Sequence, residues 1–341
     1  MPPRLRGVDR MGAHFSSMWT QFFPPSPTFT ERNVPDLTGR VCLVTGANTG
    51  VGKQLARLLY SKNARVYIAA RSESKANEAI QDIKKSHPSS DGLLSFLHLD
   101  LNDLSSVQAS AHSFMSKEAE LHVLVNNAGV QNQNRPPKTA QGYEHHLGIN
   151  TIAPYLFTRL LTPVLAATAR AKTAPPGSVR VLWVSSQGTE LGGLPSIGVD
   201  VDNLDYHDDT DDMTKYALSK TGNWLHAVEY ARRHRDDGII SVALNPGNLS
   251  SDLYRNDAPM AVRLVIRCLG HPPVRGAYTE LYAGFSTDIT MEKTGCWVIP
   301  FGRTAEIRKD LREARLPKEE GGNGNAARFW KWTEDQVKPY L

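Results

Sequence analysis

Tyr216 and Lys220 stand four positions apart in the segment YALSK, within a stretch expected to be helical over about 214–235. A tyrosine phenol has a pKa of about 10 and is a poor proton donor at neutral pH. Side chains at i and i+4 share one helix face, so the lysine ammonium would lie beside the phenol. At about 5 Å and an effective dielectric near 20, their attraction is worth roughly 3 kcal/mol, or about two pKa units. The pair predicts a tyrosine that works as a general acid or base.

A glycine-rich turn reads TGANTGVG from Thr45 to Gly52 and follows the apolar run VCLVT. Glycines let the backbone turn tightly and approach a pyrophosphate, whose charge then faces free N–H groups at the start of the next helix. The spacing GxxxGxG departs from the dinucleotide rule GxGxxG, and Gln54 replaces the Ser or Thr that a phosphate-binding P-loop requires after its lysine. The strand, turn and helix context still favours a bound dinucleotide over a plain turn.

Basic residues dominate the region where the ribose of such a dinucleotide would bind. The ribose of NAD is usually held by an acidic residue about 20 positions after the glycines. No Asp or Glu occurs between Lys53 and Ser72, and the second expected strand ends at Arg71. An arginine can pair with a 2′-phosphate in a fork geometry, whereas a carboxylate would repel it. We therefore expect NADP (NADPH) rather than NAD, against the alternative that Arg71 is a solvated surface charge.

The elements that must position these residues follow from alternating apolar and amphipathic segments, the pattern of βαβ units in a parallel sheet. This pattern predicts a single α/β domain with a doubly wound parallel sheet over 38–303. An N-terminal arm, 1–37, precedes the domain, a helical lid over 250–290 belongs to it, and a charged C-terminal tail, 304–341, follows it. The expected strands are VCLVT, RVYIAA, LLSFLHL, LHVLV, VRVLWVSS, IISVALN and 297–299, and the expected helices cover about 50–61, 72–86, 103–117, 140–170 and 214–235.

Polar side chains follow several of these strands. Ser185 and Ser186 end one strand, and the segment NNAG, 126–129, ends another. Open α/β sheets bind ligands at the carboxyl ends of their strands, so these side chains should converge on one edge with the glycine turn. In the tail, Phe329, Trp330 and Trp332 are expected to pack back onto the core.

The composition of the chain excludes some classes of binding partner and indicates its location. With 341 residues, 40% hydrophobic and 22% charged, the chain has the composition of a globular protein, and a net charge of +4 is too weak for a nucleic-acid footprint. Three widely separated cysteines predict no metal site and a reducing compartment. No uninterrupted apolar run reaches the roughly 18–20 residues of a membrane span, and no secretory signal is evident. We expect a cytoplasmic protein with no integral membrane segment; its oligomeric state is left open.

Taken together, the motifs resemble the short-chain dehydrogenase/reductase family. TGANTGVG, NNAG, LGIN, the strand ending in SS, YALSK and NPGNLSS occur in the family's order over roughly residues 38–300. The resemblance implies a Rossmann fold, a nicotinamide cofactor and a catalytic tetrad. In that tetrad Tyr216 would exchange a proton with the substrate oxygen, and Lys220 would lower the pKa of Tyr216 and bind the nicotinamide ribose. Ser186 would hold the carbonyl oxygen, and Asn150 would anchor a water in a proton relay.

The same resemblance implies the cofactor contacts. Asp100 would contact the adenine, and Asn127 would lie by the adenosine ribose. Pro246, Gly247, Leu249 and Ser251 would lie beside the nicotinamide. The full expected cofactor set is Thr45, Gly46, Asn48, Gly50, Val51, Gly52, Arg71, Asp100, Asn127, Gly129, Tyr216, Lys220, Gly247, Leu249 and Ser251.

Thirty residues separate Ser186 from Tyr216, a length that resembles the retinol-dehydrogenase-like branch of the family. The arm, the tail and the turn ARSESK resemble reductases of filamentous fungi, many of them from secondary-metabolite pathways. These resemblances imply an NADP-dependent oxidoreductase that interconverts a carbonyl and an alcohol on a lipophilic small molecule. A non-enzymatic NADP(H)-binding redox sensor and a sugar-nucleotide epimerase are the alternatives. The complete tetrad argues against the sensor, and the GxxxGxG spacing argues against the epimerase.

Overall fold

The computed structural model describes residues 19–131, 138–192, 194, 198–208, 210–250 and 270–341. Its centre is an eight-stranded sheet in the order β3-β2-β1-β4-β5-β6-β7-β8. Neighbouring strands are parallel from β3 to β7, and β8 runs antiparallel to β7. The strands are β1 Val41–Thr45, β2 Arg65–Ala70, β3 Leu93–His98, β4 Val123–Asn126, β5 Val179–Val184, β6 Ile239–Leu244, β7 Trp297–Ile299 and β8 Arg303–Ala305.

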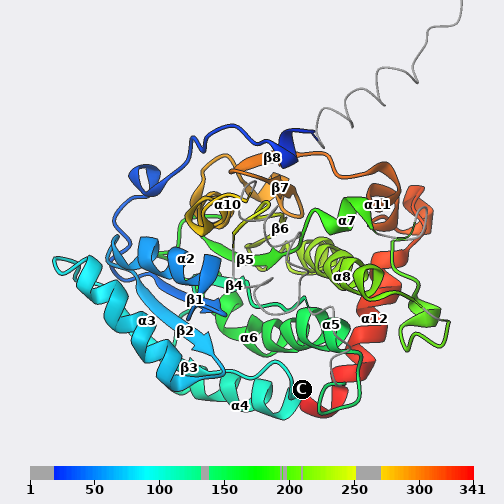
Figure 1. Cartoon of the computed structure of the whole chain (residues 1–341), viewed down its shortest axis with the longest axis horizontal. Coiled ribbons are helices and arrows are strands. Elements are labelled where there is room, and N and C mark those ends of the chain that lie inside the picture. Colours follow the sequence, from blue (N-terminus) through cyan, green and yellow to red (C-terminus); the bar gives the residue numbers. More distant parts are fainter. Residues whose placement is uncertain (1–18, 132–137, 193, 195–197, 209, 251–269) are drawn as a thin grey trace, which may run out of the picture.

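Helices cover both faces of this sheet, as Figure 1 shows. Apolar residues of α2, α3 and α10 pack with the strands in one core cluster, and those of α4, α6 and α8 pack in the other. Because both faces are covered, all five residues of β1 and all six of β5 are buried. The doubly wound Rossmann-type fold expected from the sequence is confirmed. The bounds are α2 Gly50–Tyr60, α3 Glu73–Ser86, α4 Leu104–Met115, α6 Ala153–Arg170, α8 Asp212–Arg233 and α10 Pro273–Phe285.

The helix expected over 140–170 begins later and contains an irregular turn. It consists of α5, His145–Leu147, a π-helical turn, Gly148–Ile152, and α6. Single π-helical turns are frequent at functional sites, and this one contains Asn150. By length and composition, His145–Arg170 is the one helix among the described residues that could cross a membrane. It is largely buried between the sheet and its neighbouring helices, as a core helix is.

The predicted lid, 250–290, is wrong for its second half. Residues 251–269 lie outside the described residues, but α10 is a core helix that packs against α2 and the strands β5 and β6. Ala277 and Leu281 are fully or almost fully buried there. Short helices elsewhere are α7 Gly188–Leu191, α11 Lys309–Ala314 and the 3-10 turns Glu31–Asn33, Val201–Asn203, Met291–Lys293, Lys318–Glu320 and Lys338–Tyr340.

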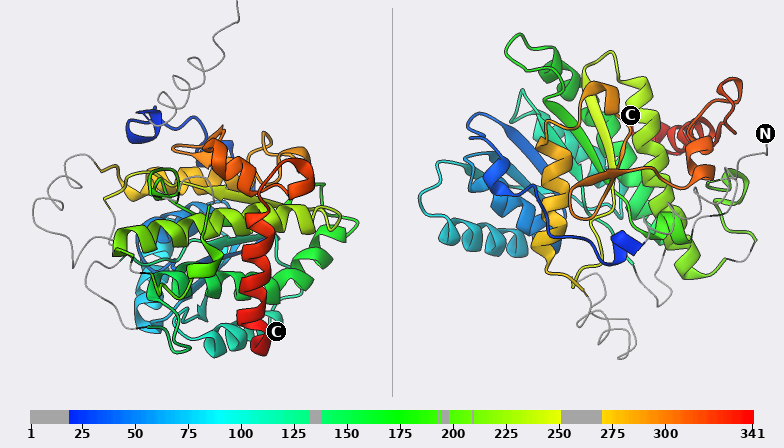
Figure 2. Two further views of the ribbon diagram at one scale, coloured as in Figure 1. Left: turned by 90° about the vertical axis from the view of Figure 1, so that its right-hand side faces the viewer. Right: turned by 90° about the horizontal axis from the view of Figure 1, so that it is seen from above.

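The C-terminal tail folds back on the body, as its aromatic residues predicted. Helix α12, Asn325–Val337, contacts α8 and α6 and lies across the outer side of their layer (Figure 2). Phe329 and Trp330 are 0% and 1% exposed. Tyr155 and His226 contact the Trp330 ring, and the His226 ring stacks on Phe329. The tail therefore supports the helix that carries Tyr216 and Lys220.

Candidate active site

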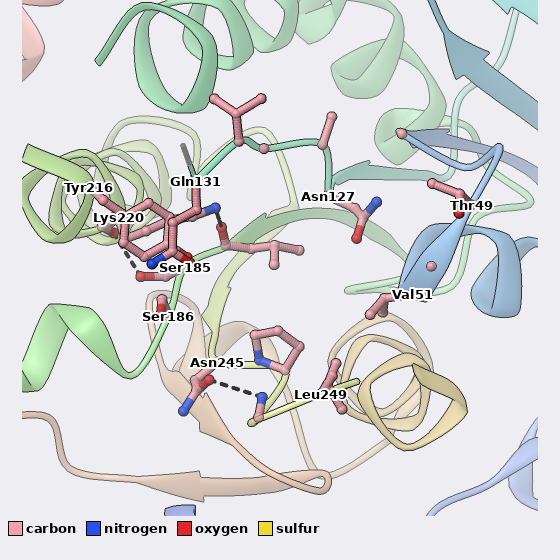
Figure 3. Close-up of a pocket in the computed structure, with 18 of the residues that line it drawn as sticks. Thr49, Val51, Asn127, Gln131, Ser185, Ser186, Tyr216, Lys220, Asn245 and Leu249 are labelled. Carbon is pink, nitrogen blue, oxygen red and sulfur yellow. Dashed lines mark hydrogen bonds between the residues drawn. The ribbon is translucent and has the colours of Figure 1, made fainter. Parts of the chain in front are cut away.

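A cavity of about 580 Å³ opens at the carboxyl ends of β1, β4, β5 and β6, where the strand order reverses (Figure 3). This is the edge at which open α/β sheets bind ligands, and the volume suits a large organic ligand. Twelve residues of the expected site line the cavity: Gly46, Asn48, Gly50, Val51, Arg71, Asn127, Gly129, Ser186, Tyr216, Lys220, Gly247 and Leu249. The glycine turn and the Tyr216–Lys220 pair therefore share one cavity.

The glycines of the turn serve two different purposes. A Cβ on Gly52 would lie 2.5 Å from Nδ2 of Asn127 and 2.8 Å from the carbonyl oxygen of Gly46, so only glycine fits there. Gly46, at a φ of +67°, would bring a Cβ 3.0 Å from Cα of Ala128. A Cβ on Gly50, at a φ of +57°, would meet no atom within 4 Å. Gly46 and Gly52 thus let the turn pack on the loop after β4, and Gly50 allows its left-handed bend.

The start of α2 borders the cavity through Gly50 and Val51. The first N–H groups of an α-helix have no partner within the helix and carry partial positive charge, which favours phosphate. A cradle of glycine backbone at a helix start, inside a cavity of this size, fits the diphosphate of a dinucleotide. The residues present therefore fit a nicotinamide cofactor.

Thr45 and Asn127 hold the turn in place. The Thr45 hydroxyl accepts a hydrogen bond from the backbone N–H of Ala128 at 2.9 Å, and Nδ2 of Asn127 donates to the Thr45 carbonyl at 2.7 Å. Thr45 is 2% exposed and does not line the cavity, and neither does Gly52. The structure therefore gives both residues a supporting position behind the turn.

Of the five basic residues between 53 and 71, Arg71 is the one that lines the cavity. It follows β2 directly, and it forms no ion pair with any residue that the structure describes. Lys53 pairs with Asp82 on α3 at 2.7 Å, and Arg65 pairs with Glu118 at 2.7 Å. These two cations are thus paired within the protein, whereas Arg71 lines the cavity, where it can pair with an anionic ligand.

Helix α8 presents Tyr216 and Lys220 on one face, as their spacing predicts. Asp211 caps the helix by accepting hydrogen bonds from the N–H groups of Met213 and Thr214, both at 3.0 Å. The Lys220 ammonium lies 5.9 Å from the centre of the Tyr216 ring. The ammonium is therefore a neighbour of the phenol ring on this face of the helix.

Lys220 is buried, with 4% of its surface exposed, and its Nζ donates to the carbonyl oxygen of Val184 at 3.0 Å. Burial lowers the pKa of Lys220 from 10.5 to about 8, because the interior disfavours the charged form. The side chain therefore still carries its proton at pH 7, although less tightly than an exposed lysine.

Asn150, the fourth member of the expected tetrad, does not line the cavity. Its side chain accepts from the N–H of Val130 at 2.7 Å and donates to the Val130 carbonyl and the Ser219 hydroxyl, both at 3.0 Å. A Cβ on Gly129 would lie 3.0 Å from Nζ of Lys220 and 3.1 Å from Oδ1 of Asn150, so this glycine lets the two groups approach. The Asn150 amide thus ties the loop after β4 to α8.

The two serines after β5 differ in their surroundings. The Ser185 hydroxyl is 2.7 Å from both the Thr189 hydroxyl and the carbonyl oxygen of Lys220. The Ser186 hydroxyl accepts from the N–H of Gly188 at 3.1 Å. Accepting that bond leaves its own hydrogen free to donate, so the chemistry favours Ser186 as the group that holds a substrate oxygen.

Two further expected contacts fall outside the cavity or the described residues. Asp100 follows β3 and does not line the cavity; its carboxylate accepts from the N–H of Asn102 at 3.0 Å. Ser251 lies outside the described residues. Outside the expected cofactor and catalytic sets, the cavity lining also contains Thr49, Ala128, Val130, Gln131, Val184, Ser185, Asn245, Pro246 and Asn248, of which Thr49, Ala128, Ser185, Asn245, Pro246 and Asn248 stand in the predicted motifs. Most of them are sequence neighbours of predicted residues. A prediction that included every residue at the carboxyl end of each strand would have contained them.

Comparison with known proteins agrees with this geometry. A family model described as short chain dehydrogenase matches residues 40–191. A short-chain dehydrogenase/reductase of Phomopsis amygdali is 53% identical over 330 residues, which cover 95% of this chain and 97% of that protein. Short-chain dehydrogenase/reductase bet4 of Neocamarosporium betae is 49% identical over 343 residues, which cover 100% of this chain and 98% of that protein.

Solved structures share the fold. An NADPH-bound carbonyl reductase from chicken fatty liver matches with a TM-score of 0.56 at 22% identity, over 76% of this chain and 96% of that one. A 3-ketoacyl-(acyl-carrier-protein) reductase from Brucella melitensis, complexed with NADH, matches with a TM-score of 0.58 at 22% identity, over 78% of this chain and 98% of that one.

Proposed function

The chain belongs to the short-chain dehydrogenase/reductase family, and we propose that it interconverts a carbonyl and an alcohol on a lipophilic small molecule with NADP(H). One observation carries the proposal. The buried Tyr216–Lys220 pair and Ser186 line the same cavity as the glycine turn, so proton-transfer groups and a dinucleotide cradle lie together. A redox sensor has no need for this arrangement.

A nicotinamide bound in the cavity supplies the hydride, and the protein supplies placement and a proton. In the direction of reduction, Tyr216 donates its phenolic proton to the carbonyl oxygen of the substrate. Ser186 donates a hydrogen bond to the same oxygen and stabilises the negative charge that develops on it. Lys220, protonated below pH 8, stabilises the phenolate that remains on Tyr216.

The hydrogen bonds of the Asn150 side chain support a positioning role for this residue in the proposal. Its amide is engaged by Val130 and Ser219, so its side chain has little capacity left for a water. A water in a proton relay would then be held by a group other than the Asn150 side chain. The Asn150 side chain keeps the loop after β4 in contact with Lys220.

The preference for NADP rests on Arg71. This exposed guanidinium borders the cavity at the end of β2, and no acidic residue is among the described residues that line the cavity. A 2′-phosphate would form charge-assisted hydrogen bonds with it. Structures of the same fold contain NADPH in one case and NADH in another, so the fold itself does not decide the preference.

The relatives support the biological setting of the proposal. The two short-chain dehydrogenase/reductases that are 53% and 49% identical to this chain come from fungi, which supports a tailoring step in fungal secondary metabolism. The described cysteines, Cys42 and Cys296, are unpaired, which supports a reducing compartment such as the cytoplasm.

Fluorescence titration with NADPH and NADH, followed by turnover on lipophilic aldehydes, ketones and polyketide-like carbonyls, tests the proposal. We expect tighter binding of NADPH and its oxidation with at least one carbonyl class. Binding of NADPH without oxidation across the whole panel would contradict the proposal and favour a sensor. NAD that stays bound through purification would instead favour an epimerase.

A further inference from the structure

Gln21 is a buried polar residue in a segment that is otherwise exposed. It belongs to the helical residues 19–22 of the N-terminal arm, which lie beside β8 in Figure 1. Its neighbours Trp19 and Phe23 are 66% and 55% exposed, but Gln21 is only 1% exposed. Burying an amide is costly unless both of its ends find partners. The burial of this one side chain therefore needs an explanation.

Both ends of the Gln21 amide are hydrogen-bonded to distant parts of the chain. Its Nε2 donates to a carboxylate oxygen of Glu190 in α7 at 2.6 Å. Its Oε1 accepts from Nδ2 of Asn245, in the loop after β6, at 3.0 Å. Glu190 is 4% exposed and Asn245 is 2% exposed. An amide suits this place because it offers a donor to the carboxylate and an acceptor to the second amide.

Asn245 is the direct link from Gln21 to the cavity. It lines the cavity, and its Oδ1 accepts from the backbone N–H of Gly247 at 3.0 Å. Gly247 has a φ of +99°, and a Cβ there would lie 3.1 Å from Cγ of Pro300. The loop after β6 is therefore held in an unusual shape, and Asn245 sets part of that shape through its side chain.

Glu190 leads to the other wall of the cavity. It lies in α7, which begins two residues after Ser186, and the Ser186 hydroxyl accepts from the N–H of Gly188 in the same helix. Arg308 of the C-terminal tail donates to the Glu190 carbonyl at 2.7 Å. Gln21 thus bridges the segment that carries Ser186 and the loop that contains Gly247.

The arm has a second attachment that keeps Gln21 in this position. Nη2 of Arg303 in β8 donates to the carbonyl oxygen of Thr20 at 2.8 Å, and Nε of the same side chain donates to the Pro300 carbonyl at 2.8 Å. The main chain next to Gln21 is therefore fastened to the edge of the sheet. A loosely attached arm could not hold two cavity walls at a set distance.

We propose that Gln21 is a positioning residue for the reaction: through Asn245 and Glu190 it sets the spacing between Ser186 and the Gly247 loop. The N-terminal arm is then a working part of the active site, although Gln21 itself does not touch the cavity. This inference rests on the proposed function, because it concerns the same site.

A charge exchange across the bridge tests the inference. Gln21→Glu places a carboxylate against Glu190, which removes the donor and adds repulsion. Adding Glu190→Gln restores a donor on the other side, and Glu at position 21 can then accept from both position 190 and Asn245. Gln108→Glu is a matched control, because Gln108 on α4 donates one hydrogen bond to the Tyr340 carbonyl, far along the chain from the cavity lining.

We expect Gln21→Glu to lower kcat/KM for the carbonyl and the affinity for NADPH by about tenfold, the effect of losing one buried hydrogen bond. The double variant should recover most of both losses, and the Gln108→Glu control should keep the kinetic constants of the wild type. Gln21→Met, of similar size and uncharged, should lie between wild type and Gln21→Glu. This neutral variant keeps the test informative if Gln21→Glu fails to fold.

Two results would overturn the inference. One is unchanged kcat, KM and NADPH affinity in folded Gln21→Glu or Gln21→Met. The other is a loss of kcat/KM and NADPH affinity that Glu190→Gln does not repair, and that is equal to the loss in the Gln108→Glu control at the same fall in melting temperature. That result would indicate a structural role alone. Failure of the proposed function can be told apart from failure of this inference. In that case the wild-type protein would oxidise no NADPH with any carbonyl, but NADPH titration of the variants would still measure the effect of the Gln21 hydrogen bonds.

Discussion

The two ends of the cavity are built in different ways. The glycine-turn end is formed by one continuous stretch of chain, 46–51, which Thr45 and Gly52 seat on the loop after β4, with Arg71 beside it. The Tyr216 end is lined by side chains from three separate segments, which carry Ser186, the α8 pair and Asn245. Asn150 and Gln21 hold these segments by hydrogen bonds from outside the cavity lining. At the glycine-turn end, close contacts with the backbone leave no room for a Cβ. At the Tyr216 end, buried side chains are held by hydrogen bonds.

This difference reflects two kinds of chemistry. A phosphate is recognised by backbone N–H groups at a helix start, so the requirement is close approach and local glycines suffice. A proton is transferred by side chains whose pKa values depend on burial and on charged neighbours, so the requirement is an assembled environment. We therefore expect changes at the Tyr216 end to act on turnover, and changes at the glycine-turn end to act on cofactor binding and choice.

Lys220→Met should have the largest of the three effects that follow. It removes the charge that stabilises the phenolate, so we expect kcat to fall by about 10²–10⁴-fold, the usual contribution of general acid–base catalysis. Because burial lowers the pKa of Lys220 to about 8, wild-type carbonyl reduction should decline as pH rises through 8 and the ammonium is lost. The variant should lack this decline. A kcat–pH profile of both proteins checks this; the same decline in Lys220→Met would assign it to another group.

Arg71→Glu tests the glycine-turn end. A carboxylate would repel the 2′-phosphate and could accept from a ribose hydroxyl, so the preference should move from NADPH toward NADH. We expect NADPH affinity to fall about 10–100-fold, the loss of one or two hydrogen bonds to a charged group. Titration of wild type and variant with NADPH and NADH measures the affinities. The value of kcat is measured in the same proteins at saturating cofactor. A large fall in kcat without a change in affinity would show that the two ends are not separable in this way.

Glu280 offers the smallest and most specific test, since it should change stability and leave turnover alone. It is fully buried in α10, which packs against α2 behind the glycine turn, and burial raises its pKa from 4.5 to about 8. The folded protein therefore keeps a proton that the unfolded chain releases. The resulting stabilisation is complete below about pH 4.5 and is lost as pH rises to about 8, at up to about 1.4 kcal/mol per pH unit.

Glu280→Gln keeps the shape and removes this titration. The variant should unfold at higher denaturant concentration than wild type at pH 8.5, with a smaller difference at pH 6, and with equal kcat at pH 7. Urea unfolding at the two pH values makes the measurement. An identical pH dependence in the two proteins would show that this carboxyl does not titrate in the range.

The parts of the fold that were predicted correctly have strong local signals. The buried strands are almost wholly apolar and are separated by amphipathic helices, a pattern that arises where helices cover both faces of a parallel sheet. Strand β8 was missed because Arg303–Ala305 is short, polar and paired along one side. Helix α10 was assigned to a lid because an apolar helix after the last long strand packs equally well, by pattern alone, on a sheet or over a cavity.

The same division applies to the site. The Tyr216–Lys220 spacing and the glycine turn are local, and both proved to line one cavity. The bonds of Asn150 to Val130 and Ser219 join residues 20 and 69 positions apart, and the bond from Asn245 to Gln21 spans 224 positions. Such contacts depend on how the arm and the loops are placed in three dimensions. No spacing rule along the chain predicts them.

Tyr216→Phe, measured by NADPH titration and by single-turnover oxidation of bound NADPH with a reactive carbonyl, is the most direct test of the proton-donor role. The ring still fills its place on α8, so NADPH should bind with nearly unchanged affinity, while the rate of oxidation should fall by at least about 10²-fold because the proton source is gone. Wild-type oxidation rates in the variant would contradict the account, since the phenol would then not be the acid.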